Sequence, residues 1–145
     1  MAFPPIRWCV MCEDARIENR RQVSLLGFYG VTPDVEIAIS DFNQPIERLA
    51  FYLWTQGESD GRTHKLTFEV LDPEQNRIIG PITTSPEGVA PRAHAPITFG
   101  VIFTAGNLPL RLPGRYQIVV RIDADESRYE TSFVVRQARL ADIAP

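Results

Sequence analysis

The chain has 145 residues and a formal net charge of −3, and its basic residues do not gather into a stripe. The electrostatic footprint of a nucleic-acid-binding protein is therefore missing, so we expect no nucleic-acid partner. No apolar stretch approaches the roughly 20 residues of a membrane span, so we expect no membrane partner. One domain of residues 1–145 can bury a core without a disulfide or metal, and two cysteines in such a chain indicate a cytoplasmic setting.

Short apolar runs alternate with turn-forming residues along the whole chain, and no helical periodicity is sustained. This pattern favours strands joined by hairpins and loops. We predict about nine strands, at residues 6–12, 23–29, 34–39, 46–56, 64–72, 78–83, 97–104, 115–122 and 128–136. Residues 84–96 form the extended irregular stretch that the sequence predicts.

The alternation within several strands predicts one buried and one solvated face. Tyr116, Ile118 and Val120 share a face, and Arg115 and Gln117 lie on the opposite one. Strands that follow one another without helices exclude a doubly wound α/β fold. We therefore expect an all-β protein, an antiparallel Greek-key β-sandwich of about nine strands.

The first predicted strand contains a C-x-x-C pair, Cys9 and Cys12. In a strand their Cα atoms would stand about 10 Å apart, with the side chains on opposite faces, which excludes a disulfide between them. A zinc site would need two further ligands, and neither His64 nor His94 has the local spacing of a zinc finger. We interpret both cysteines as core residues and expect no metal and no cofactor.

The strand at residues 46–56 is apolar on both faces. Leu49, Phe51 and Leu53 share one face, and the opposite face holds Tyr52 and Trp54. A strand with a solvated outer face should alternate, so something is expected to cover this second face. Within one chain the Phe3-Pro4-Pro5 segment or the tail at residues 139–143 could do so. Because Tyr and Trp often anchor interfaces, the alternative hypothesis is that Tyr52 and Trp54 contribute to a homo-oligomer contact.

Three polar features were weighed as sites. Residues 57–61 match the letters of the G-x-S-x-G nucleophile motif, but a strand rather than a helix follows, so we interpret Ser59 as part of a polar hairpin loop. His64 shares a face with apolar residues and is interpreted as a rim or core histidine. Arg92 and His94 lie in the irregular stretch and are the weak candidates for ligand binding.

Near the C-terminus, Leu110-Arg-Leu-Pro-Gly-Arg-Tyr116 resembles the tyrosine corner of immunoglobulin-like and fibronectin type III domains. In those domains a Tyr near the start of a late strand returns its hydroxyl to upstream backbone. The resemblance implies a structural role for Tyr116 and an immunoglobulin-like C-terminal half. An ordinary hairpin with a half-buried Tyr is the alternative.

A wider resemblance includes both ends of the chain. Its motifs are the acidic-x-Arg-x-Glu segment that ends at Glu18, the S-L-x-G-x-Y strand at 24–29, residues 66–73, and the P-G-x-Y sequence that ends at Tyr116. These are similar to a family of uncharacterised bacterial β-sandwich domains of unknown function. The resemblance implies a bacterial source and supplies no catalytic residue.

The function that we expect is a non-enzymatic interaction or accessory module, with an unidentified protein or a second copy of the chain as partner. No set of nucleophile, base and orienting residue is evident in the sequence, which disfavours an enzyme. The alternative is a β-sandwich that binds a small ligand or carbohydrate through the loops at residues 57–62 and 84–96.

Overall fold

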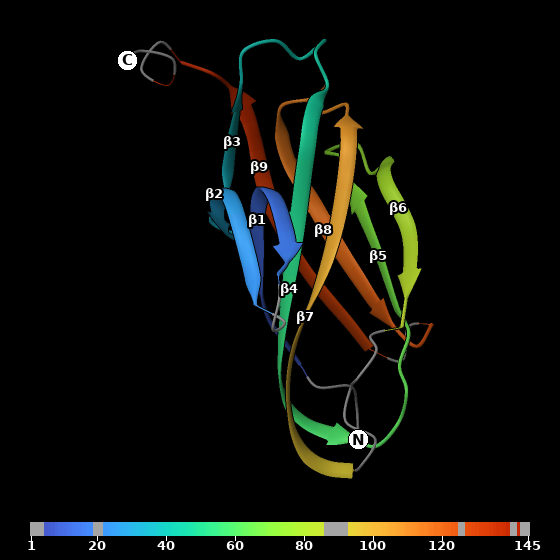
Figure 1. Cartoon of the computed structure of the whole chain (residues 1–145). Coiled ribbons are helices and arrows are strands. Elements are labelled where there is room, and N and C mark those ends of the chain that lie inside the picture. Colours follow the sequence, from blue (N-terminus) through green and yellow to red (C-terminus); the bar gives the residue numbers. More distant parts are fainter. Residues whose placement is uncertain (1–4, 19–21, 86–92, 125–126, 140–141, 143–145) are drawn as a thin grey trace.

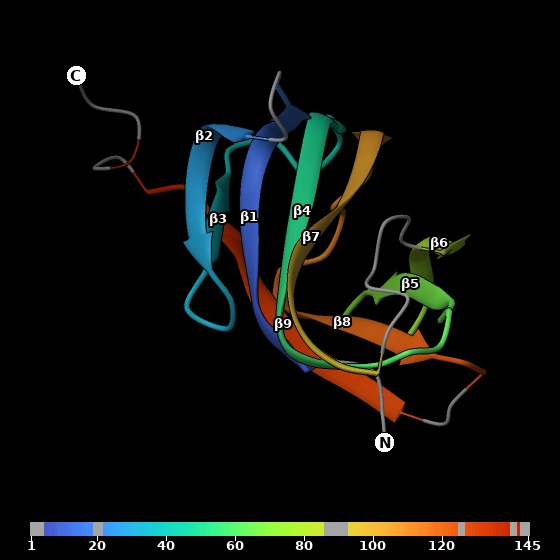
Figure 2. The same ribbon diagram turned by 60° about the horizontal axis from the view of Figure 1, so that its bottom comes forward.

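In the computed structural model, residues 5–18, 22–85, 93–124, 127–139 and 142 are described, and residues 59, 60 and 93–99 by their backbone alone. These residues form two stacked β-sheets (Figures 1 and 2). Sheet A has the strand order β2-β1-β4-β7, and sheet B has the order β3-β9-β8-β5-β6. The strands are β1 (Ile6–Ile17), β2 (Val23–Val31), β3 (Glu36–Ile39), β4 (Ile46–Asp60), β5 (Leu66–Leu71), β6 (Arg77–Thr84), β7 (Ala93–Leu108), β8 (Gly114–Ile122) and β9 (Ser127–Gln137).

The all-β sandwich predicted from the sequence is therefore confirmed, and each of the nine predicted strands overlaps an observed one. β4 and β7 are neighbours in sheet A although β5 and β6 lie between them in sequence, which is the crossover expected of a Greek key. Figure 2 shows β2, β1, β4 and β7 as one layer and β9 and β8 in the other.

β4 and β7 extend into the segments predicted as loops, and this corrects the prediction. Asp60 of β4 pairs with Ala93 of β7, and Glu58 pairs with Pro96, so residues 57–60 and 93–96 are strand instead of loop. The turn-forming residues of each segment favour a loop when the segment is considered alone, which is why the sequence predicted loops there. Each segment is extended because the other supplies its backbone hydrogen-bond partners, and such long-range pairing leaves no local signal.

One strand pair departs from the predicted antiparallel arrangement. β3 runs parallel to β9, with Glu36 opposite Val134 and Ile39 opposite Gln137. The chain leaves sheet A at the end of β2 and enters sheet B directly as β3. Because no hairpin joins β3 to its neighbour β9, its direction is not forced to reverse.

Aromatic rings join the two sheets in the core. Phe51 of sheet A lies 5.0 Å from Phe68 and 6.2 Å from Phe133, both of sheet B, measured between ring centroids. Phe68 also stacks on Phe103 at 4.4 Å. All four rings are at most 4% exposed. Burial of these rings, at about 2 to 3 kcal/mol each, is a large favourable term for sandwich formation.

Tyr116 makes the contact that the tyrosine-corner interpretation requires. Its side chain is 1% exposed, and its hydroxyl donates to the Leu112 carbonyl oxygen at 2.8 Å. The Leu112 N–H donates to the same hydroxyl oxygen at 3.3 Å. The ring thereby fastens the chain before β8 to the core. The immunoglobulin-like character of the C-terminal half stays a prediction.

Candidate functional site

The outer face of sheet A is the candidate site, and the alternation within β4 creates it. Leu49, Phe51 and Leu53 point into the core and are fully buried. Tyr52 and Trp54 point to the opposite side, away from sheet B, and stay partly exposed. Because successive side chains of a strand point to opposite faces, the two apolar sets of β4 cannot both enter one core.

Neighbouring strands extend this apolar surface. On one side of β4, Trp8 of β1 lies opposite Trp54, and Val10 lies opposite Tyr52. Val10 also pairs with Val31 of β2, and on the other side of β4, Ile102 of β7 pairs with Tyr52. We call this surface the outer apolar face, and it consists of Trp8, Val10, Cys12, Phe28, Val31, Ala50, Tyr52, Trp54 and Ile102.

Large apolar side chains of this face are open to solvent. Phe28 is 62% exposed, Trp8 is 45% exposed and Val31 is 41% exposed. Both tryptophans of the chain belong to the face. Single exposed apolar residues are ordinary on a protein surface, but a contiguous group of them marks an interaction site.

The aromatic rings of the face are held in place by their neighbours. The rings of Tyr52 and Trp54 lie 6.2 Å apart at an interplanar angle of 54°. Tyr52 lies directly over Gly100 of β7, where a Cβ atom would overlap the tyrosine ring. Because Gly100 has no side chain, β7 leaves the space that the Tyr52 ring occupies. The ring is thus already positioned in the free domain.

Charges appear where β1 continues beyond the apolar residues. The Asp14 carboxylate accepts from Arg16 at 2.8 Å and lies 3.2 Å from the Arg48 guanidinium. The hydrogen bond from Arg16 and the charge of Arg48 together hold the pKa of Asp14 below its usual value. These three side chains belong to the lining of a hollow of about 410 Å³ that also contains Leu26 and Tyr29.

The two cysteines lie as the strand geometry predicted. Cys9 belongs to the core between the sheets, and Cys12 belongs to a small cluster with Ala15 and Ala50. Both are free thiols, and burial raises the pKa of Cys9 to about 12 and also raises that of Cys12. The thiolate that metal binding and redox chemistry require is thus disfavoured at both positions.

His64 is buried in contact with a carboxylate that the sequence reasoning did not assign to it. Its Nδ1 hydrogen-bonds with Asp123, which also accepts from the Lys65 amide at 3.0 Å. Partial burial by itself would raise the pKa of Asp123, but the hydrogen bonds from His64 and Lys65 outweigh it and lower that pKa. The pairing of Leu66 with Ile122 brings the two residues together.

The candidate ligand residues are not assembled into a described site. Arg92 lies outside the described residues, and His94 and Ser59 are described by their backbone alone within β7 and β4. Across the part of the chain that is described, side chains included, no group of three or more His, Cys, Asp or Glu residues could hold a metal ion. None of the described segments is a helix long and apolar enough to cross a membrane.

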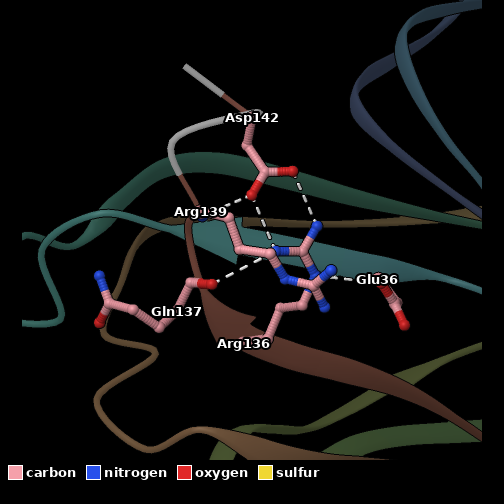
Figure 3. A network of polar contacts seen from close by, with 5 residues as sticks. All are labelled: Glu36, Arg136, Gln137, Arg139 and Asp142. Atoms are coloured by element: carbon pink, nitrogen blue, oxygen red, sulfur yellow. Dashed lines mark hydrogen bonds and ion pairs between the residues drawn. The ribbon is translucent and has the colours of Figure 1, made fainter. Parts of the chain in front are cut away.

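Arg139 and Asp142, the described residues of the tail segment 139–143, lie away from the outer apolar face, and the rest of this alternative is not tested. Figure 3 shows Asp142 bound to Arg136 of β9, which also holds Glu36 of β3. The Arg139 amide donates to the same Asp142 carboxylate at 2.6 Å. These contacts fix Arg139 and Asp142 at the β3–β9 edge of sheet B. Residues 1–4 lie outside the described residues, so the alternative of the Phe3-Pro4-Pro5 segment is not tested.

Sequence reasoning identified Tyr52 and Trp54 but missed Trp8, Phe28 and Val31. A signal was present, because β2 reads Val-Ser-Leu-Leu-Gly-Phe-Tyr-Gly-Val and, like β4, carries apolar residues of both parities. What the sequence does not contain is the pairing that places these residues beside Tyr52 and Trp54.

The fold and the face define a two-sheet all-β domain with an apolar outer surface on one sheet. Residues 7–136 match the sequence profile of a family of unknown function, DUF6941, and the chain belongs to that family. The match covers all nine strands except Ile6, the first residue of β1, and Gln137, the last residue of β9. No curated protein shows significant similarity to the chain.

Proposed function

We propose that this domain is a non-enzymatic interaction module of the bacterial cytoplasm and that the outer apolar face is its binding surface. The observation that carries the proposal is the exposure of Phe28 (62%) on β2 and Trp8 (45%) on the neighbouring β1, within a group of uncharged residues on one side of sheet A. Exposed apolar surface of this extent is costly in water, so its retention is explained by a partner that covers it.

The composition of the face supports binding to a protein. Aromatic residues are enriched at the centres of protein interfaces, where they bury a large area with few rotatable bonds. The rings of Tyr52 and Trp54 are already oriented by each other and by the gap at Gly100. Little side-chain entropy remains to be lost on binding, which favours affinity.

The cellular setting rests on two further observations. Both cysteines are free and buried, as is usual in a reducing compartment. The motifs Ser-Leu-Leu-Gly-Phe-Tyr in β2 and Pro-Gly-Arg-Tyr before β8 are those by which the sequence resembles bacterial domains.

Affinity purification from the source cell tests the proposal. The wild-type chain should retain a protein that the Phe28→Ser/Trp8→Ser variant loses. The matched control is Ile82→Ser, which removes an exposed apolar residue (37%) from sheet B and should retain the same protein as the wild type. If all three chains retain the same proteins, the outer apolar face is not the surface that binds them.

A further inference from the structure

We propose that the partner on the outer apolar face is a second copy of this chain, stacked face to face across a two-fold axis. This inference rests on the proposed function, because it names the occupant of the same surface. An isologous dimer needs a patch that is complementary to itself. The dimensions of the face, its charges and the side chain that protrudes from it bear on that requirement.

The outer side of sheet A, which contains the outer apolar face and its charged end, has about the size of one standard interface. β1 contains 12 residues, and strands of that length in a four-stranded sheet cover an area of about 40 by 19 Å, or roughly 760 Å². A stable complex buries about 800 Å² on each partner. Along β1 the apolar residues of the face lie at positions 8 to 12, and the charged residues Asp14 and Arg16 follow towards the end of the strand.

The charges of the face do not oppose its own copy. The residues that make up the outer apolar face carry no formal charge, so stacking two of them buries no unpaired ion. The charged end holds both signs, with Asp14 between Arg16 and Arg48. A face of one sign would repel its copy, whereas this end can pair with the same end of a second chain or remain solvated. The net charge of −3 is also small.

Phe28 protrudes from the outer apolar face. Phe28 of β2 is 62% exposed, while Cys12 and Ala50, the next residues across β1 and β4, are fully buried. Leu25 and Ile102 pack against Cys12 and Ala50, so Phe28 stands beside a closed, apolar part of the face. A protruding aromatic ring of this kind is a typical anchor of a protein interface.

The described residues of the tail do not cover the outer apolar face. Arg139 and Asp142 are held at Arg136, on the β3–β9 edge of sheet B. Among the described residues, therefore, the apolar side chains of sheet A have no cover from the C-terminal segment, and a second sheet A supplies a surface of the same extent and chemistry.

Sedimentation equilibrium of the purified chain tests the proposal, with tryptophan fluorescence as a second readout. We expect a dimer at micromolar concentrations. Because both tryptophans lie on the face, their emission should shift to longer wavelength on dilution, with the same midpoint as dissociation. Phe28→Ser should raise the dimer dissociation constant at least about tenfold, as loss of a central anchor does. Ile82→Ser, on sheet B, should leave the constant unchanged.

Tyr52→Ser/Trp54→Ser should also dissociate the dimer, with circular dichroism confirming that the chain remains folded. A monomer at high micromolar concentration, with concentration-independent emission, would overturn the dimer. So would a dimer that survives both variants. The two proposals can fail separately. If the chain is a monomer that still retains a foreign protein through Phe28 and Trp8, the dimer is wrong and the proposed interaction surface is kept with a different partner.

Discussion

The two sheets of this domain present outer faces of opposite character. Sheet A exposes Phe28 and Trp8 without a charged residue between them. On sheet B, Glu69 is only 2% exposed yet is bound by Arg77 at 2.8 Å and by Arg121. Sheet B therefore satisfies its outer polar groups within the chain, whereas sheet A leaves apolar surface that a partner can cover. Under the proposed function, folding completes the outer face of sheet B, whereas association would complete that of sheet A.

The largest effect is expected where sheet B buries a charge. In the Arg77→Leu/Arg121→Leu variant the buried Glu69 carboxylate loses both arginines. The free energy of unfolding should therefore fall by about 3 kcal/mol. Urea denaturation measures the loss. The triple variant that also contains Glu69→Leu should recover most of the stability, because an apolar cluster of similar volume carries no unpaired charge. Equal losses in the two variants would show that the ion pairs act mainly by packing.

A second contrast concerns a glycine in an edge strand of each sheet. Gly80 of β6 has a φ of +80°, and a Cβ atom there would overlap the Phe68 carbonyl oxygen. Gly80→Ala should cost about 2 kcal/mol because backbone must move. At Gly100 of β7 the obstacle is the Tyr52 ring, which can rotate, so Gly100→Ala should cost less than about 1 kcal/mol. Thermal melts of the two variants compare the costs, and a reversed order would contradict this account.

A third comparison concerns Tyr116, which lies in the core between the two sheets. Tyr116→Phe removes the hydrogen bond to the Leu112 carbonyl and leaves the Leu112 N–H without that acceptor. We expect a loss of about 1 kcal/mol in the free energy of unfolding with the fold retained. Denaturant midpoints measure the change. A midpoint identical to that of the wild type would reduce Tyr116 to a packing residue.

The smallest effect is expected at Asp123, which links the end of β8 to His64. Because its pKa is lowered in the folded chain, Asp123 contributes stability above the unfolded pKa of an aspartate, and this contribution disappears as pH falls through the folded value. Asp123→Asn should cost less than about 1 kcal/mol at neutral pH, with the difference from wild type narrowing in acid. Asp34→Asn, at an exposed carboxylate, controls for the lost charge. A difference that stays constant from neutral to acid pH would contradict the linkage.

The strands and the inner core were predictable because their signal is local. Alternation identified the strand at residues 115–122, and the odd separation of Cys9 and Cys12 correctly placed their side chains on opposite faces. The two-sided apolar pattern of β4 also correctly singled out Tyr52 and Trp54 as residues outside the core. Each of these conclusions follows from the two-residue period of a strand, which the sequence carries directly.

The tertiary structure alone decided what lies beside those residues. An irregularity in β1 between Ile6 and Trp8 places Ile6 in the core and Trp8 on the outer apolar face, although simple alternation would put them together. The same holds for Phe28, which joins the face through its pairing with Cys12. Register between strands distant in sequence depends on the sum of many cross-strand contacts, so no short stretch of the chain encodes it.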